Sequence, residues 1–110
     1  MLFSITVSYI RPLEVVKEHL DAHKEWLVRY IMAGTIIVAG PVPQGDGGFI
    51  LAHAQDASEI TGMIADDPFD RHKVARFDIR ACDPALRAAD FPERWASAAK
   101  AFAVAPQGLS

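Results

Sequence analysis

The sequence predicts an α+β domain of the ferredoxin-like type, with an antiparallel sheet that carries both of its helices on one face. Three observations lead to this prediction. Apolar residues alternate with polar ones in several short segments of residues 1–82, a long helical pattern follows the first of these segments, and a short helical pattern precedes the last. The expected order is β-α-β-β-α-β, which is typical of two interleaved βαβ halves.

Length and composition limit the class of protein. A chain of 110 residues has room for one domain with one core, and 51% hydrophobic residues exclude a disordered chain. The 11 basic residues are scattered and the net charge is −3, so we expect no nucleic-acid partner. No apolar run approaches the roughly 20 residues that span a bilayer, so we expect no membrane partner. Residues 1–10 lack the basic start and long apolar stretch of a signal peptide, which predicts a cytoplasmic protein.

The first strand is expected over residues 2–10 and the first helix from Leu13 onward. The apolar side of the strand is made by Phe3, Ile5, Val7 and Tyr9. Pro12 suits the first turn of a helix because its missing N–H is not needed there. Apolar residues then recur at three- and four-residue steps, which indicates an amphipathic helix ending near Gly34. The predicted inward stripe consists of Leu13, Val16, Leu20, Leu27 and Ile31.

Two strands joined by a hairpin are expected next. Thr35–Ala39 and Phe49–Ala54 flank residues 40–48, which form the most turn-rich stretch of the chain. The apolar residues expected on the face of the sheet that the helices leave open are Ile36, Val38 and Ile50. An uncovered face of this kind exposes a large apolar patch. We therefore predict a homodimer in which two copies cover each other's open sheet faces.

A short helix and a fourth strand complete the predicted domain. Asp56 and Glu59 have the spacing of a capping box at the start of this helix. The expected buried side of the helix is made by Ala57, Ile60, Met63 and Ile64. Val74–Cys82 alternates as a strand, and Cys82 is expected to be a buried, inert thiol.

The chain is expected to divide into two parts. Residues 1–82 form the ferredoxin-like domain, and residues 83–110 form an alanine-rich tail with a helical patch around Glu93–Phe102.

His23 is the first candidate for chemistry. It lies three residues after Leu20 and four before Leu27, so its spacing places it on the inward stripe. Taken alone, it fits a core histidine bonded to a backbone group. Beside a carboxylate, it would instead be a general acid or base. His19 and His23 together have the i,i+4 spacing that can bind a metal ion. The sequence spacing provides no third ligand, so we predict no metal site.

Asp67 and Arg11 are further candidates. Pro68 steers Asp67 away from helical geometry and into a turn, where it fits either a simple turn aspartate or an active-site carboxylate. Asp66 is expected to be the more solvated of the two neighbouring aspartates. Arg11 fits either an anchor for an anionic substrate group or a loop arginine in water.

The order of these segments resembles the YCII-related family over residues 1–82. The residues that carry the resemblance are the first strand, then RPLEVVKEHLDAHKEWL, then G-x5-GP from Gly34 to Gly40-Pro41, then GGFILA, DDPF and VARFDI. Relatives tend to carry a glycine near Lys73, and often a basic residue in the hairpin loop where this chain has Gln44-Gly45-Asp46. The alanine-rich tail lies outside the resemblance.

The resemblance implies a dimeric α+β barrel whose active site pairs a histidine of the first helix with an aspartate in a DP[FY] motif. By position these are His23 and Asp67, which become the candidate catalytic residues. The candidate substrate-binding residues are Arg11, Gly40, Pro41 and Phe69. Relatives with a known reaction include a dehydrochlorinase that acts on a chlorinated hydroxyquinol.

Two functions fit these observations. The first is a small enzyme without a cofactor, a lyase or isomerase acting on a small oxygenated cyclic or aromatic metabolite, in which His23 moves a proton and Asp67 orients it. The second is a non-enzymatic module that binds a small ligand or rigidifies a dimer, since this fold hosts both kinds of protein. An enclosed cavity beside His23 favours the first, and a filled site favours the second.

Overall fold

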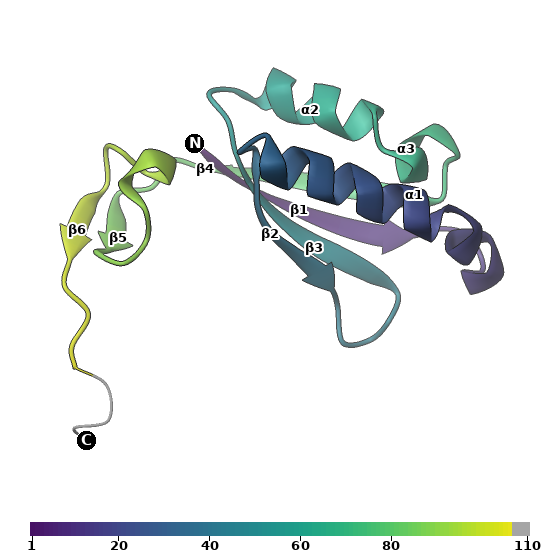
Figure 1. The fold of residues 1–110 in the computed structure, drawn as a ribbon, viewed down its shortest axis with the longest axis horizontal. Coiled ribbons are helices and arrows are strands. Elements are labelled where there is room, and N and C mark those ends of the chain that lie inside the picture. The colour runs from purple at the N-terminus through teal and green to yellow at the C-terminus, as the bar shows by residue number, and fades with distance from the viewer. Residues whose placement is uncertain (107–110) are drawn as a thin grey trace.

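The computed structural model describes residues 1–106. The elements of the first part of the chain are β1 (Leu2–Tyr9), α1 (Leu13–Met32), β2 (Ile36–Pro41), β3 (Gly47–His53), α2 (Ala57–Ala65), α3 (Pro68–Arg71) and β4 (Ala75–Cys82). The strands lie in the order β2-β3-β1-β4, and every neighbouring pair is antiparallel. Figure 1 shows α1 and α2 on the same side of this sheet. The predicted ferredoxin-like α+β fold is confirmed.

The core lies between the sheet and its helices. Ile5 of the central strand β1 pairs with Ile50 on one side and Ile79 on the other, and paired residues of antiparallel strands point to the same face. Ile36 and Ile50 are both 2% exposed and belong to this core, so their predicted place on the open face is wrong. Ile50 faces the helices because it pairs with Ile5. For Ile36 the cause is a bulge between Ile36 and Val38, which places these two residues on opposite faces despite their two-residue spacing.

The open face of the sheet carries fewer apolar residues than expected. Val38 and Phe49 lie there and are 52% and 41% exposed, beside the half-buried Leu51. The charged residues of this face come from β4 and are Arg76, Asp78 and Arg80. Cys82 is also exposed, so its predicted burial is wrong. The alternation of β4 turns Ala81 toward the helices and Cys82 the other way.

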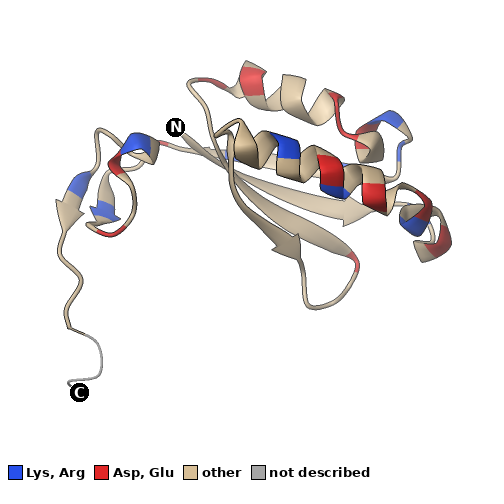
Figure 2. Ribbon diagram, in the orientation of Figure 1, with Lys and Arg blue, Asp and Glu red and all other residues tan. Residues whose placement is uncertain are grey.

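The inward face of α1 differs from the predicted stripe at both ends. Its buried residues are Val16, His23 and Trp26, whereas Leu13 and Ile31 are 52% and 44% exposed. At about 100° per residue, Leu13 and Ile31 both lie roughly 80° to the same side of His23, so they fall on the flank of α1 and not on its buried face. α1 carries both acidic and basic residues, as Figure 2 shows.

The helix ends follow the predicted signals. Gly34 has a φ of 88°, and its N–H donates to the Ile31 carbonyl as α1 ends. Asp56 accepts from the Glu59 N–H at 3.2 Å, while the Glu59 carboxylate accepts from the Gln55 N–H at 2.7 Å. The capping interaction is therefore present, with its return bond one residue earlier than the usual position.

The tail differs from its prediction. Its elements are β5 (Leu86–Ala88), the 3-10 turn η1 (Glu93–Trp95) and β6 (Lys100–Phe102), and β5 pairs with β6 in parallel. The helix expected over Glu93–Phe102 is wrong, because so short a helix is marginal without a core to pack against, and Figure 1 shows the tail apart from the sheet. The end of the predicted tail, residues 107–110, lies outside the described residues. Within residues 1–106, no helix is long and apolar enough to cross a bilayer.

Candidate active site

A histidine and an aspartate that are 44 positions apart meet beneath α1. The Nδ1 atom of His23 lies 2.9 Å from Oδ1 and 3.0 Å from Oδ2 of Asp67. His23 is 8% exposed and Asp67 is fully buried. An ionised carboxylate only accepts hydrogen bonds, so the Nδ1 atom carries the proton and donates it to Asp67. The other ring nitrogen, Nε2, makes no hydrogen bond within residues 1–106.

Local sequence explains the position of the carboxylate. Asp67 is the N-cap of α3, with extended backbone at φ −78° and ψ 129°, and Pro68 occupies the first helical position. The Oδ1 atom of Asp67 accepts from the Phe69 N–H at 3.0 Å. This carboxylate is therefore held by α3 itself and by the histidine of α1, so its position does not depend on solvent.

Contacts from α1 to α2 and to Asp66, which precede Asp67 in the chain, fix the position of α1 relative to α2. The Nε1–H of Trp26 donates to the Met63 carbonyl at 3.0 Å. Asp66 is partly exposed and forms ion pairs with Arg29 of α1 and Arg71 of α3. The adjacent aspartates thus have different environments, and the expectation that Asp66 is the more solvated one agrees with the structure.

Aromatic rings surround the imidazole. The ring of Phe69 stacks on His23 with a centroid distance of 3.9 Å and an interplanar angle of 4°. Trp26 lies at 5.5 Å on the same helix, and Tyr9 meets Phe69 edge-on at 5.8 Å. These contacts limit rotation of the imidazole, so the direction of Nε2 is set by packing as well as by Asp67.

A cavity of about 270 Å³ opens beside His23, between α1 and the β2–β3 hairpin. Its lining residues are Val7, Tyr9, Leu20, His23, Lys24, Leu27, Ala39, Gly40, Pro41, Gly47, Gly48, Phe49, Ile50 and Phe69. The predicted substrate-binding residues Gly40, Pro41 and Phe69 are thus beside His23. Asp67 does not line this cavity but contacts the far side of the imidazole.

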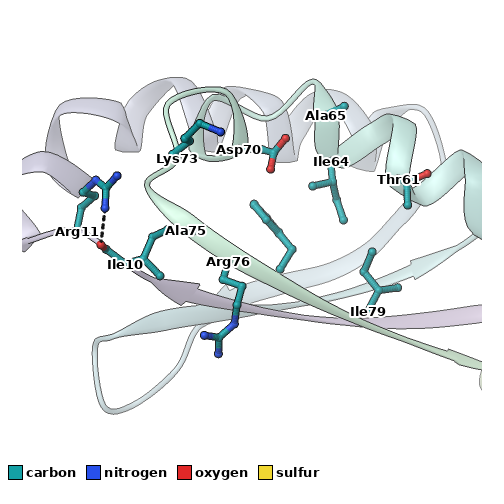
Figure 3. Close-up of a pocket in the computed structure, with 11 residues that line it drawn as sticks. Ile10, Arg11, Thr61, Ile64, Ala65, Asp70, Lys73, Ala75, Arg76 and Ile79 are labelled. Atoms are coloured by element: carbon teal, nitrogen blue, oxygen red, sulfur yellow. Dashed lines mark hydrogen bonds between the residues drawn. The ribbon is translucent and has the colours of Figure 1, made fainter.

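Arg11 lies elsewhere. Together with Lys73 it lines a separate groove between β4 and the helices α2 and α3 (Figure 3), to which Phe77 also contributes. Its Nη1 atom donates to the Ile10 carbonyl at 3.1 Å. The structure therefore does not bring Arg11 to the cavity of His23.

Tyr9 is a residue of the cavity that sequence reasoning missed as a functional candidate. Burial first, and then the negative charge of Asp46, raise the pKa of the Tyr9 phenol. It is therefore a neutral hydrogen-bond donor at physiological pH. The sequence could have indicated it, because Tyr9 is the last residue on the apolar side of β1 and the one on that side with a hydroxyl group.

The two histidines considered for a metal have other partners: Nδ1 of His23 is bonded to Asp67. The ring of His19 stacks on His72 at a centroid distance of 4.2 Å. Within residues 1–106, no three His, Cys, Asp or Glu side chains are grouped as a metal site would require.

Fold and site together define a ferredoxin-like α+β domain with a buried His–Asp pair beside a largely apolar cavity. A family model described as the YCII-related domain matches residues 1–82. The chain belongs to the YCII-related family, which confirms the resemblance found in the sequence.

Other comparisons bear on the fold. A comparison with curated proteins finds no match. Among solved structures, the 5-chloro-2-hydroxyhydroquinone dehydrochlorinase of Burkholderia phenoliruptrix AC1100, in complex with 2,5-dihydroxybenzoquinone, is similar with a TM-score of 0.64 and 24% sequence identity. The match covers 77% of this chain and 96% of that chain. At this identity the likeness supports the fold.

Proposed function

We propose that this protein is a small-molecule enzyme, a lyase or isomerase, in which His23 moves a proton and Asp67 holds it in position. The observation that carries the proposal is the asymmetry of the imidazole: Nδ1 is bonded to a fully buried carboxylate, while Nε2 has no hydrogen-bond partner within residues 1–106 and the ring lines a cavity. A histidine so placed is oriented as a general base.

The proton transfer requires no group beyond the chain and its substrate. Nε2 takes a proton from an O–H or C–H group of the substrate, the freed electron pair forms a new double bond, and a leaving group such as chloride departs. In an isomerisation, Nε2 returns the proton at another atom. Asp67 stabilises the imidazolium that forms in either case, since its negative charge lies 2.9 Å from Nδ1.

The cavity favours a small, ring-shaped, oxygenated substrate. An apolar cavity of about 150 Å³ can hold benzene, so about 270 Å³ has room for a substituted single ring. The neutral Tyr9 hydroxyl supplies a hydrogen bond to an oxygen that gains negative charge in the reaction. The similar dehydrochlorinase acts, by its name, on a substrate of this class.

The assembly and location that accompany this proposal are also predictions. We propose a homodimer through the open face of the sheet, supported by the exposed Val38 and Phe49. We expect the protein to work in the cytoplasm and without a cofactor.

The test is a turnover assay on chlorinated and unchlorinated hydroxyquinols, followed by ultraviolet absorbance and chloride release. We expect His23→Gln to lower turnover by roughly 100- to 10,000-fold, as loss of a general base does, while 2,5-dihydroxybenzoquinone still binds. The matched control is His19→Gln on the same helix, outside the cavity, which should keep wild-type turnover.

The assay separates the two candidate functions. Binding of the quinone at the cavity without turnover of any hydroxyquinol favours the binding-module function. Turnover that survives His23→Gln contradicts the proposed role of the histidine.

A further inference from the structure

We propose a second binding site, for a small carboxylate with a flat apolar body, in the groove between β4 and the helices α2 and α3. The groove has a volume of about 600 Å³ and shares no lining residue with the His23 cavity. The residues that carry the proposal are Arg11, Ile64, Asp70, Lys73, Phe77 and Ile79. The proposal does not depend on the function proposed for His23.

The charges of the groove favour a ligand with one negative charge. Arg11 and Lys73 are two cations that have no ion-pair partner within residues 1–106. Asp70 is the one carboxylate among the lining residues, so Arg11, Lys73 and Asp70 together carry a net charge of about +1. Arg76 also contributes to the lining, but its guanidinium pairs with Asp78 and points away from the groove in Figure 3.

The apolar part of the groove results from the sheet topology. β4 is an edge strand, so its helix-facing side chains are covered on one side only. Phe77 and Ile79 face the helices and yet are only half-buried, next to the buried Ile64. A flat apolar group laid against these three side chains would remove their remaining surface from water.

The cations and the apolar floor occupy different parts of the groove. Figure 3 shows Arg11 and Lys73 at one end and Ile79 and Thr61 at the other. A ligand with its negative charge at one end and a ring at the other matches this division. Asp70 lies between the two ends and accepts a hydrogen bond from a hydroxyl group on the ring.

The backbone of Lys73 supports a role for its side chain. Within residues 1–106, Lys73 is the one residue other than glycine with a positive φ, at 53°. Its N–H donates to the Asp70 carbonyl and the Val74 N–H to the Phe69 carbonyl, which ends α3. Glycine adopts this conformation without strain, whereas lysine does not. A strained position thus places a long cationic side chain at the end of the groove.

The α3 helix separates the two sites. Asp67 and Phe69 contact His23 on one side of it, whereas Asp70 and Lys73 face the groove. A ligand in the groove can therefore be distinguished from a ligand in the His23 cavity by which residues change their NMR signals.

The experiment compares benzoate with benzamide, its neutral analogue of the same shape, by ¹H–¹⁵N NMR titration of the full chain. We expect benzoate to shift saturably the amide signals of Lys73, Phe77 and Ile79, and benzamide to bind roughly tenfold more weakly. 3-Hydroxybenzoate should bind more tightly than benzoate, because its hydroxyl projects from the side of the ring and can reach Asp70 between the two ends of the groove.

Two substitutions at one position separate charge from strain. Lys73→Gln keeps the strained backbone but removes the charge, so it should lose roughly tenfold in benzoate affinity with little change in the unfolding temperature. Lys73→Gly should lose the same affinity and raise the unfolding temperature by a few degrees, because the strain is relieved. Lys17→Gln, on the exposed side of α1, is the control and should bind benzoate like the wild type.

Three results would overturn the proposal. One is equal affinity for benzoate and benzamide, which removes the role of charge. Another is an unchanged benzoate affinity in Lys73→Gln. The third is the absence of a saturable shift at the groove, including the case in which benzoate shifts only residues of the His23 cavity.

Discussion

The imidazole of His23 and the carboxylate of Asp67 are joined through a single ring nitrogen, with Nδ1 2.9 Å and 3.0 Å from the two carboxylate oxygens. Both oxygens of Asp67 face the same donor, and Oδ1 also accepts from the Phe69 N–H. Because the carboxylate has no proton to donate, the contact selects the tautomer of the neutral histidine. Nε2 is then left as the acceptor.

This relationship predicts the tautomer of His23. ¹⁵N NMR of the neutral imidazole should show the proton on Nδ1. In Asp67→Asn, the side chain gains an N–H donor, so we expect the Nε2–H tautomer to appear and turnover of a substrate to fall, by analogy with the wrong tautomer caused by the same change in serine proteases. A wild-type imidazole protonated mainly on Nε2 would contradict the orientation proposed for catalysis.

Tyr9 should make stability depend on pH in alkaline solution. Its pKa in the folded state is raised by burial and by Asp46, so the folded protein holds this proton to higher pH than the unfolded chain. The resulting stability is complete below the unfolded pKa of about 10 and is lost as pH rises through the folded pKa. Urea melts at increasing pH should show less alkaline loss in Tyr9→Phe than in the wild type.

Gly47 should tolerate no side chain. A Cβ atom at this position would lie 1.9 Å from the carbonyl oxygen of Val7, in the neighbouring strand. Gly47→Ala must push β1 and β3 apart and should cost about 3 kcal/mol or more in the free energy of unfolding. Gly62 of α2 is the matched control, because its added Cβ meets no atom within 4 Å. Gly62→Ala should stabilise the protein by about 0.5–1 kcal/mol. If Gly47→Ala and Gly62→Ala changed the free energy of unfolding equally in urea melts, the steric restriction at Gly47 would be contradicted.

The fold was readable from the sequence because local signals and the hydrophobic period agree in most segments. Asp56 and Gly34 mark helix ends by local chemistry, and the alternation of β1 marks its buried side. The face of β2 was not readable, because the bulge after Ile36 reverses the alternation and leaves no mark in the residue types. The tail was misjudged for a related reason: helix propensity decides little where no core supports the helix.

The candidate site could be predicted only in part. The spacing of His23 along α1 placed its ring toward the interior, and Pro68 placed Asp67 in a turn. The contact between His23 and Asp67 depends on how α1 packs on α3, which no local sequence pattern encodes. Arg11 was predicted to join this site because arginine can bind an anionic group. Its residue type does not indicate which of the two cavities it lines.

Trp26 should contribute more to stability than the ends of the predicted stripe. It is 1% exposed and its Nε1–H donates to the Met63 carbonyl, whereas Leu13 is 52% exposed. Trp26→Ala should cost about 3–5 kcal/mol, and Leu13→Ala should change stability by less than about 0.5 kcal/mol. Urea unfolding followed by circular dichroism measures both. A larger loss for Leu13→Ala would mean that this end of α1 is covered in solution.

The last prediction concerns the homodimer. Val38 and Phe49 are apolar, lie on the open face of the sheet and are 52% and 41% exposed in one chain. A second copy laid face to face would cover both, and we expect about 1,000 Å² or more of total buried surface, as stable interfaces usually have. Light scattering should therefore give twice the chain mass of 12.0 kDa.

Val38→Asp combined with Phe49→Asp should give a folded monomer, because neither side chain is in the core and two buried carboxylates would have no partners. Val28→Asp is the matched control: Val28 is 53% exposed but lies on α1, on the helix side, so this variant should remain a dimer. A wild-type protein that scatters as a 12.0 kDa particle at micromolar concentration, or a Val28→Asp variant that dissociates as well, would reject the open sheet face as the interface.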